Sequence, residues 1–161
     1  MRRLVGGAAL LVAVAIGGAY LNPYIIYDAA AEAGKSYVGS KACASCHEEE
    51  YENFIKYSKK AHSFHSVQLM RKELTSSELK ECFHCHTTGY GKPGGFISEK
   101  QTPDLKNLGC ETCHGPGSAH VDSEDASDIL GKVDKDSCKA CHNTDRVRAF
   151  RYKPMLYAGA H

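Results

Sequence analysis

The feature that most constrains this chain is a five-residue pattern, Cys-x-x-Cys-His, which occurs four times along the sequence. All eight cysteines fall within these motifs and none is left over. Two thiols three residues apart lie on one face of a helical turn, where they can bond to the two vinyl groups at one edge of a porphyrin. The histidine that follows then reaches the iron, so the pattern is typical of a c-type haem attachment site.

Three other uses of paired cysteines compete with this interpretation. Zinc motifs do not require a histidine directly after every second cysteine. A thioredoxin-like redox pair needs a βαβ pattern, which this sequence lacks, and exported cysteines can simply form disulfides. Because the same pattern recurs four times, we predict four covalently attached c-type haems. The thioether-forming residues are Cys43, Cys46, Cys82, Cys85, Cys110, Cys113, Cys138 and Cys141, and the proximal iron ligands are His47, His86, His114 and His142.

Five histidines remain for the distal positions of the four irons. His84 lies inside the second motif, at the porphyrin edge, and is poorly aimed at any iron. The remaining candidate distal ligands are His62, His65, His120 and His161. Met70 and Met155 are alternatives that would raise the redox potential, although both look more like packing residues. Two imidazoles leave an iron able only to exchange electrons, whereas one imidazole leaves a position for a small molecule.

Composition and periodicity predict a mainly α, loop-rich fold. The chain has no Trp and five Phe, and much of its aliphatic content lies in the first 26 residues. Small domains with so little apolar bulk depend on cofactors or cross-links. Residues 48–69 carry a helical pattern that places His62 and His65 on one face. Thr75 with Glu78 resembles a capping box, and Asp136 is a candidate cap with Gly131 ending the helix before it.

Two further segments complete the secondary-structure prediction. Residues 89–95, rich in glycine and containing Pro93, predict a loop. An alternating strand pattern is absent from the sequence. We therefore expect short helices and loops organised around the four cofactors.

The N-terminus predicts export. Met1-Arg2-Arg3 precedes an uncharged stretch over residues 4–27, and a basic end followed by an apolar run directs a segment across a membrane. Its length favours a retained transmembrane helix, although Ala31-Glu32-Ala33 is an acceptable cleavage site. We predict a signal or anchor segment at 1–33 and a tetrahaem domain at 34–161. The domain is expected on the periplasmic face of the inner membrane, with a soluble periplasmic protein as the alternative.

Charge limits the choice of partners. The formal net charge is +1, and no basic run interleaved with aromatic residues is present, so nucleic-acid binding is not expected. Basic residues gather near the end of the chain at 146–153, where they can offset haem propionates or dock an acidic partner, or simply be solvated. The oligomeric state does not follow from the sequence.

Several segments together resemble the cytochrome c-554 family of multihaem cytochromes. They are Tyr37-Val38-Gly39-Ser40, Lys60-Ala61-His62, residues 85–96, and Gly109 with the Cys-Glu-Thr-Cys-His-Gly-Pro-Gly run at 110–117. The resemblance implies a mostly helical fold around closely stacked haems, with His62 and His120 as distal ligands. It also implies that the haem attached at Cys82 and Cys85 is five-coordinate. This chain differs in ending soon after the fourth motif and in having His65. That histidine could occupy the open axial position of the haem attached at Cys82 and Cys85.

The expected function is electron transfer rather than enzymatic catalysis. A tetrahaem cytochrome would relay electrons between a membrane oxidoreductase and another redox protein outside the cytoplasm. One alternative is a haem enzyme or sensor whose open iron acts on nitric oxide or a related small molecule. Another is a subunit of a conductive filament, in which His161 ligates a haem of a neighbouring subunit.

Overall fold

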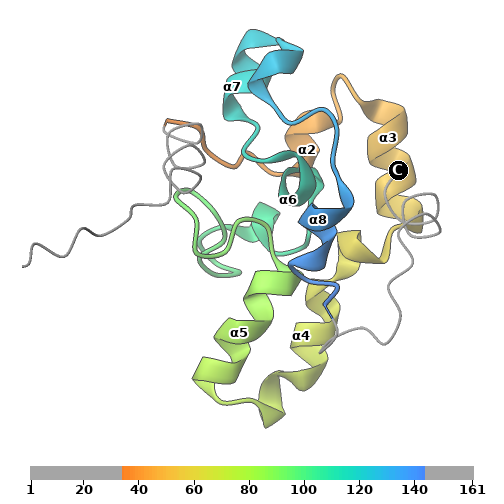
Figure 1. Cartoon of the computed structure of the whole chain (residues 1–161). Coiled ribbons are helices and arrows are strands. Elements are labelled where there is room, and N and C mark those ends of the chain that lie inside the picture. Colours follow the sequence, from red (N-terminus) through yellow and green to blue (C-terminus); the bar gives the residue numbers. More distant parts are fainter. Residues whose placement is uncertain (1–33, 144–161) are drawn as a thin grey trace, which may run out of the picture. The chain divides into compact units, whose positions relative to one another are not determined.

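The computed structural model describes residues 34–143, all of which belong to the unit Glu32–His161 (Figure 1). Short helices and loops make up this part of the chain, and it contains no β-strand, so the mainly helical prediction is confirmed. The α-helices are α2 (Ser40–Cys43), α3 (Glu48–Tyr57), α4 (Phe64–Met70), α5 (Ser76–His86), α6 (Cys110–His114), α7 (Ser118–Ser123) and α8 (Lys135–Lys139). The 3₁₀ helices are η1 (Lys59–His62), η2 (Arg71–Glu73), η3 (Pro103–Leu105) and η4 (Ala126–Asp128).

The helix predicted over residues 48–69 is interrupted at Ser58. This buried residue is extended (φ −85°, ψ 121°), and its hydroxyl accepts a hydrogen bond from the Lys60 N–H. A serine hydroxyl offers the backbone an alternative to the helical ladder, which explains the break. The prediction that His62 and His65 share one helix face is therefore wrong, because His62 ends η1 and His65 belongs to α4.

Helix α5 begins as the sequence predicts and carries the second motif at its end. The Thr75 side chain accepts from the Glu78 N–H, and the Glu78 carboxylate accepts from the Thr75 N–H at 2.9 Å. This reciprocal pair is a capping box, which satisfies donors that the first helical turn leaves without partners. The predicted cap is confirmed.

A small aromatic core lies between α4 and α5, which are side by side in Figure 1. Its buried members are Phe64, Val67, Phe96 and Leu105. Phe83 of α5 joins them, stacked on Phe64 with ring centroids 6.0 Å apart and edge-on to Phe96 at 5.2 Å. Aromatic pairs of these geometries are favourable beyond the area they bury. This part of the fold is thus held by side chains.

The predicted loop at residues 89–95 is confirmed, and it closes on itself. Gly89 has a φ of +68°, and a Cβ added at Gly95 would lie 1.8 Å from the Gly89 carbonyl oxygen. Only glycine permits so close an approach of two backbone segments. Next to the loop, the buried Thr88 hydroxyl donates to the Asn107 carbonyl at 2.6 Å and accepts from the Gly109 N–H at 2.8 Å. Thr88 thus joins the loop to the entry of the third motif.

The start of α8 differs from the prediction. Asp134, not Asp136, is the N-cap, and its side chain accepts from the N–H groups of Asp136 and Ser137. Gly131 does not end a helix, because η4 ends at Asp128 with Ile129 as its C-cap. No helix within residues 34–143 is long and apolar enough to span a membrane. The predicted apolar helix at 4–27, the boundary at residue 33 and the basic run at 146–153 lie outside the described residues.

Candidate haem-binding sites

Each of the four motifs forms a helical turn. The second and third lie within α5 and α6. In the first and fourth, the histidine N–H bonds the carbonyl of the first cysteine at 2.9 Å, from His47 to Cys43 and from His142 to Cys138. A turn of this kind places both cysteines of a motif on one face. None of the eight cysteines forms a disulfide. The motif residues therefore fit the predicted covalent attachment of haem.

Cysteines of different motifs lie against one another. The thiols of Cys43 and Cys110 share a hydrogen bond, which raises the pKa of Cys43 and lowers that of Cys110 to about 6. Burial, and then a hydrogen bond with Cys85, raises the pKa of Cys141 to about 12. The Cys141 thiol also lies 4.0 Å from the His84 carbonyl oxygen, inside the second motif. The first attachment turn is thus next to the third, and the second is next to the fourth.

Several histidine rings are held by backbone carbonyls. A carbonyl can only accept, so the Nδ1 atom of each ring carries the hydrogen and Nε2 keeps its lone pair. Such a bond orients a ligating imidazole and supports its metal bond. The bonds run from His86 to Ser63 (2.7 Å), from His114 to Leu130 (2.6 Å) and from His120 to Asp125 (2.9 Å).

His120 faces a motif histidine. Its ring centroid lies 6.2 Å from that of His47, with 33° between the ring planes. Two metal–nitrogen bonds of about 2.0 Å, added to the distance from each nitrogen to its ring centre, span about 6 Å. The space between the two rings is therefore of the size that one iron with two imidazole ligands needs.

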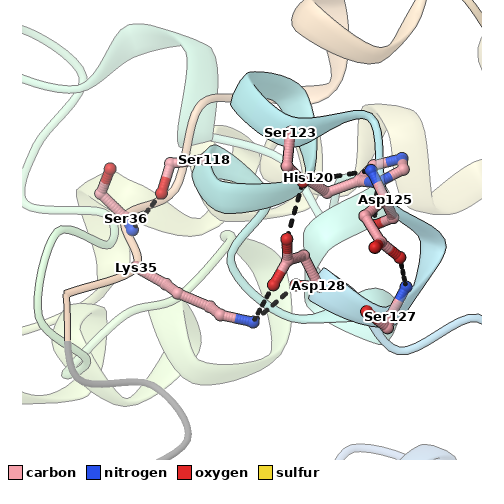
Figure 2. A network of polar contacts seen from close by, with 8 residues as sticks. All are labelled: Lys35, Ser36, Ser118, His120, Ser123, Asp125, Ser127 and Asp128. Carbon is pink, nitrogen blue, oxygen red and sulfur yellow. Dashed lines mark hydrogen bonds and ion pairs between the residues drawn. The ribbon is translucent and has the colours of Figure 1, made fainter.

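A polar loop after α7 holds His120 in place, as Figure 2 shows. The Asp125 carbonyl that accepts from His120 follows Glu124, which adopts a left-handed conformation with a φ of 58°. The Ser123 hydroxyl donates to the Asp128 carboxylate at 2.7 Å and accepts from the Asp125 N–H at 3.1 Å. Lys35 donates to the Asp128 carbonyl at 2.6 Å. The loop is thus joined to the segment that precedes α2.

The other candidate distal ligands are arranged differently. His62 donates from Nε2 to the Ile55 carbonyl at 2.9 Å, which leaves Nδ1 with the lone pair. His65 is exposed on α4, and His161 lies outside the described residues. His84 packs edge-on against Tyr90, with centroids 4.8 Å apart.

Burial, and then the nearby Lys60 ammonium, lowers the pKa of the motif histidine His142, which favours the neutral imidazole that binds metals.

Ser63 is a contributor that the sequence pattern did not single out. Besides accepting from the His86 ring, it donates from its hydroxyl to the His86 carbonyl at 3.0 Å and accepts from the Leu108 N–H at 2.9 Å. Backbone carbonyls such as those of Ser63, Asp125 and Leu130 carry no residue-type signal, so the pattern of the sequence could not reveal them.

A protein-only metal site is not part of this arrangement. Within residues 34–143, no group of three or more His, Cys, Asp or Glu side chains could hold a metal ion. A haem iron needs only one or two protein ligands, because the porphyrin supplies the others. The donor set of cysteine pairs and oriented imidazoles fits haem.

Comparison with known proteins agrees with this chemistry. The family model described as "Cytochrome c554 and c-prime" matches residues 42–115. Cytochrome c-554 of Nitrosomonas europaea is 29% identical over 133 residues, which cover 65% of this chain and 56% of that protein. The match thus spans little more than half the length of this relative. No solved structure matches the chain. The family match and the identity together support the resemblance to the cytochrome c-554 family that the motifs predicted.

Proposed function

We propose that this protein is a tetrahaem electron carrier that works outside the cytoplasm. The observation that carries the proposal is the set of eight cysteines, none in a disulfide, on four helical turns that each end in a histidine. When bound, haem would supply one-electron chemistry by cycling its iron between the ferric and ferrous states. The chain would supply the attachment, the axial ligands and the spacing of the four sites.

Contacts between the motifs support a relay rather than four independent sites. Cys43 meets Cys110, and Cys85 meets Cys141, so the four turns form two neighbouring pairs. The charge of Cys138 is also among the causes that raise the pKa of Cys113, after burial, which brings the third and fourth turns close enough to interact. The attachment sites then form one row, in the order first, third, fourth, second.

The facing rings of His47 and His120 support a proposal for axial ligation at the first site. His47 and His120 would be the proximal and distal ligands of one iron, since their centroid separation of 6.2 Å suits two imidazole bonds. The carbonyl of Asp125 would keep the Nε2 lone pair of His120 directed to the metal. A closed iron of this kind exchanges electrons without binding a substrate.

One observation favours a second candidate function at the site held by Cys82 and Cys85. The His86 ring is oriented by the Ser63 carbonyl, which binds Nδ1 and leaves Nε2 for metal. An iron ligated by His86 alone would keep one open position. The alternative is therefore a haem that binds nitric oxide or a related small molecule. His65, exposed on the neighbouring α4, is the residue that would occupy the open position of this iron.

The proposed location and partners rest on the sequence and on the resemblance to the family. The basic and apolar N-terminus predicts export, and we place the domain in the periplasm, tethered to the inner membrane. A membrane oxidoreductase and another redox protein would be its electron donor and acceptor.

The first test counts and classifies the haems in the purified full-length protein. Intact mass spectrometry should show four covalent haems and no cysteine free to react with an alkylating reagent. Fewer than four haems, or alkylated motif cysteines, would contradict the proposal.

Electron paramagnetic resonance of the oxidised protein then separates the two functions. Low-spin signals alone support the relay, whereas one high-spin signal that nitric oxide changes supports the alternative.

Two variants sharpen this spectroscopic test. His120→Ala should convert one low-spin haem to high-spin, because it removes the imidazole opposite His47. His84→Ala, which removes a ring packed on Tyr90 instead, is the matched control and should leave the spin states unchanged. An unchanged spectrum for His120→Ala would rule out the proposed axial pair.

A further inference from the structure

Glu111 is a buried carboxylate inside the third motif, only 2% exposed. Its side chain turns away from the attachment face toward the segment before α2. Oε1 accepts from the N–H groups of Val38 at 2.9 Å and Gly117 at 2.8 Å. Oε2 accepts from the N–H groups of Gly39 at 2.7 Å and Val38 at 3.2 Å. Both oxygens act as acceptors, which is the bonding pattern of an ionised carboxylate.

These bonds tie together three segments that are distant in sequence. Val38 and Gly39 lead into the first motif, Glu111 belongs to the third, and Gly117 begins the turn into α7. Helices α2 and α6, which carry Cys43 and Cys110, are in contact (Figure 1). Glu111 therefore lies where the first and third attachment turns meet.

The carboxylate is enclosed by protein. A Cβ added at Gly117 would lie 3.1 Å from Glu111 Oε1 and 3.5 Å from the Val38 side chain, so little space remains for water. Solvent screens an enclosed charge far less than an exposed one.

We propose that Glu111 is a positioning residue that also lowers the midpoint potentials of the haems held at Cys43 and Cys110. The proposal rests on haem attachment at these motifs. Oxidation leaves an iron with one more positive charge, which a fixed nearby carboxylate stabilises. Burial and outer-shell charge are among the means by which a protein tunes a bound haem. The other two attachment sites, which Glu111 does not border, should not be affected in this way.

The test is a spectroelectrochemical titration of the full-length protein with its haems attached. Glu111→Gln keeps the size of the side chain and removes its charge, so two of the four midpoint potentials should rise. Glu111→Asp keeps the charge but shortens the side chain and admits water, so the same two potentials should rise by less. Asp104→Asn removes an exposed carboxylate close to Gly39 and should change none of them.

Each outcome decides the proposal. Four unchanged potentials in Glu111→Gln, or an equal rise of all four, would overturn it and leave Glu111 a purely structural residue. If that variant does not fold, Glu111→Asp decides in its place, because unchanged potentials there would also overturn the proposal. Haem counting by mass spectrometry comes first, so that a failure of haem attachment is recognised as a failure of the proposed function instead.

Discussion

Two regions of the described chain are held together by different means. Between α4 and α5, apolar side chains form a core around Phe64, with Val67, Phe96 and Leu105 buried beside it. The region of α2, α6, α7 and α8 has no buried apolar side chain on any of these helices, and Glu111 is the buried residue of α6. Hydrogen bonds to backbone and to histidine rings connect its segments. The first region resembles an ordinary small core, whereas the second depends on what its cysteines and histidines bind.

Bound haems would contribute most to folding in the region of α2, α6, α7 and α8. A region with little apolar burial gains too little free energy to offset the conformational entropy that folding removes. Covalent haems would supply both apolar surface and cross-links at the positions where α2, α6 and α8 lack them. The α4–α5 region has a side-chain core of its own, so removing cofactors and removing core side chains should damage different parts of the molecule.

The largest effect is expected from removing the third attachment site. Replacing both Cys110 and Cys113 by serine should leave three haems. It should also loosen α6 and α7, because these helices bury no apolar side chain. Limited proteolysis with mass spectrometry should then find new cuts near residues 110–128. Residues 64–97 should stay protected, since their core is intact. Equal loss of protection in both regions would remove the distinction between them.

A large but different effect is expected from opening the side-chain core. Phe64 is 1% exposed, and Phe64→Ala should lower the free energy of unfolding by about 3–5 kcal/mol, the usual cost of such a truncation. The variant should still carry all four haems, because no motif residue is changed. Denaturant unfolding followed by circular dichroism measures the loss. Leu69→Ala, on the same helix at 68% exposure, is the matched control and should change stability by less than about 0.5 kcal/mol. Loss of haem in Phe64→Ala would mean that the two regions are coupled.

Local signals predicted the features that depend on neighbours in sequence. The four motifs, the Thr75–Glu78 capping box and the loop at 89–95 each depend on residues a few positions apart, and the last two appear in the structure as expected. The cap of α8 was misplaced by two residues, because Asp134 and Asp136 carry the same chemistry and only the backbone decides between them.

Features that depend on distant partners did not follow from the sequence. The buried Ser58 ends α3 within what looks like one amphipathic helix. Glu111 occupies an x position of the Cys-x-x-Cys-His motif, where the pattern specifies no residue type. In the structure its carboxylate accepts a hydrogen bond from Val38, 73 residues away. Spacing left His120 as one of four distal candidates and the resemblance paired it with His62, but neither indicated that its ring lies opposite that of His47. In each case the partner is set by tertiary contact, which periodicity and spacing do not encode.

The smallest effect concerns the start of α5, at the edge of the side-chain core. Thr75→Ala removes the hydroxyl that caps the helix and should lower the free energy of unfolding by about 1 kcal/mol at neutral pH.

The Thr75 hydroxyl, and then the Thr75 N–H, hold the pKa of Glu78 below its ordinary value in the folded protein. The cap therefore stabilises the fold above the ordinary pKa of a glutamate, and this contribution is lost as the pH falls through the lowered value. Unfolding curves of the wild type and Thr75→Ala should accordingly differ most at pH 7 and approach each other in acid, where the bond from the hydroxyl to the Glu78 carboxylate is lost. Glu81→Gln, an exposed change on the same helix, should show no such convergence. A difference that stays constant with pH would mean that the Thr75 hydroxyl caps α5 through the Glu78 N–H alone, without the Glu78 carboxylate.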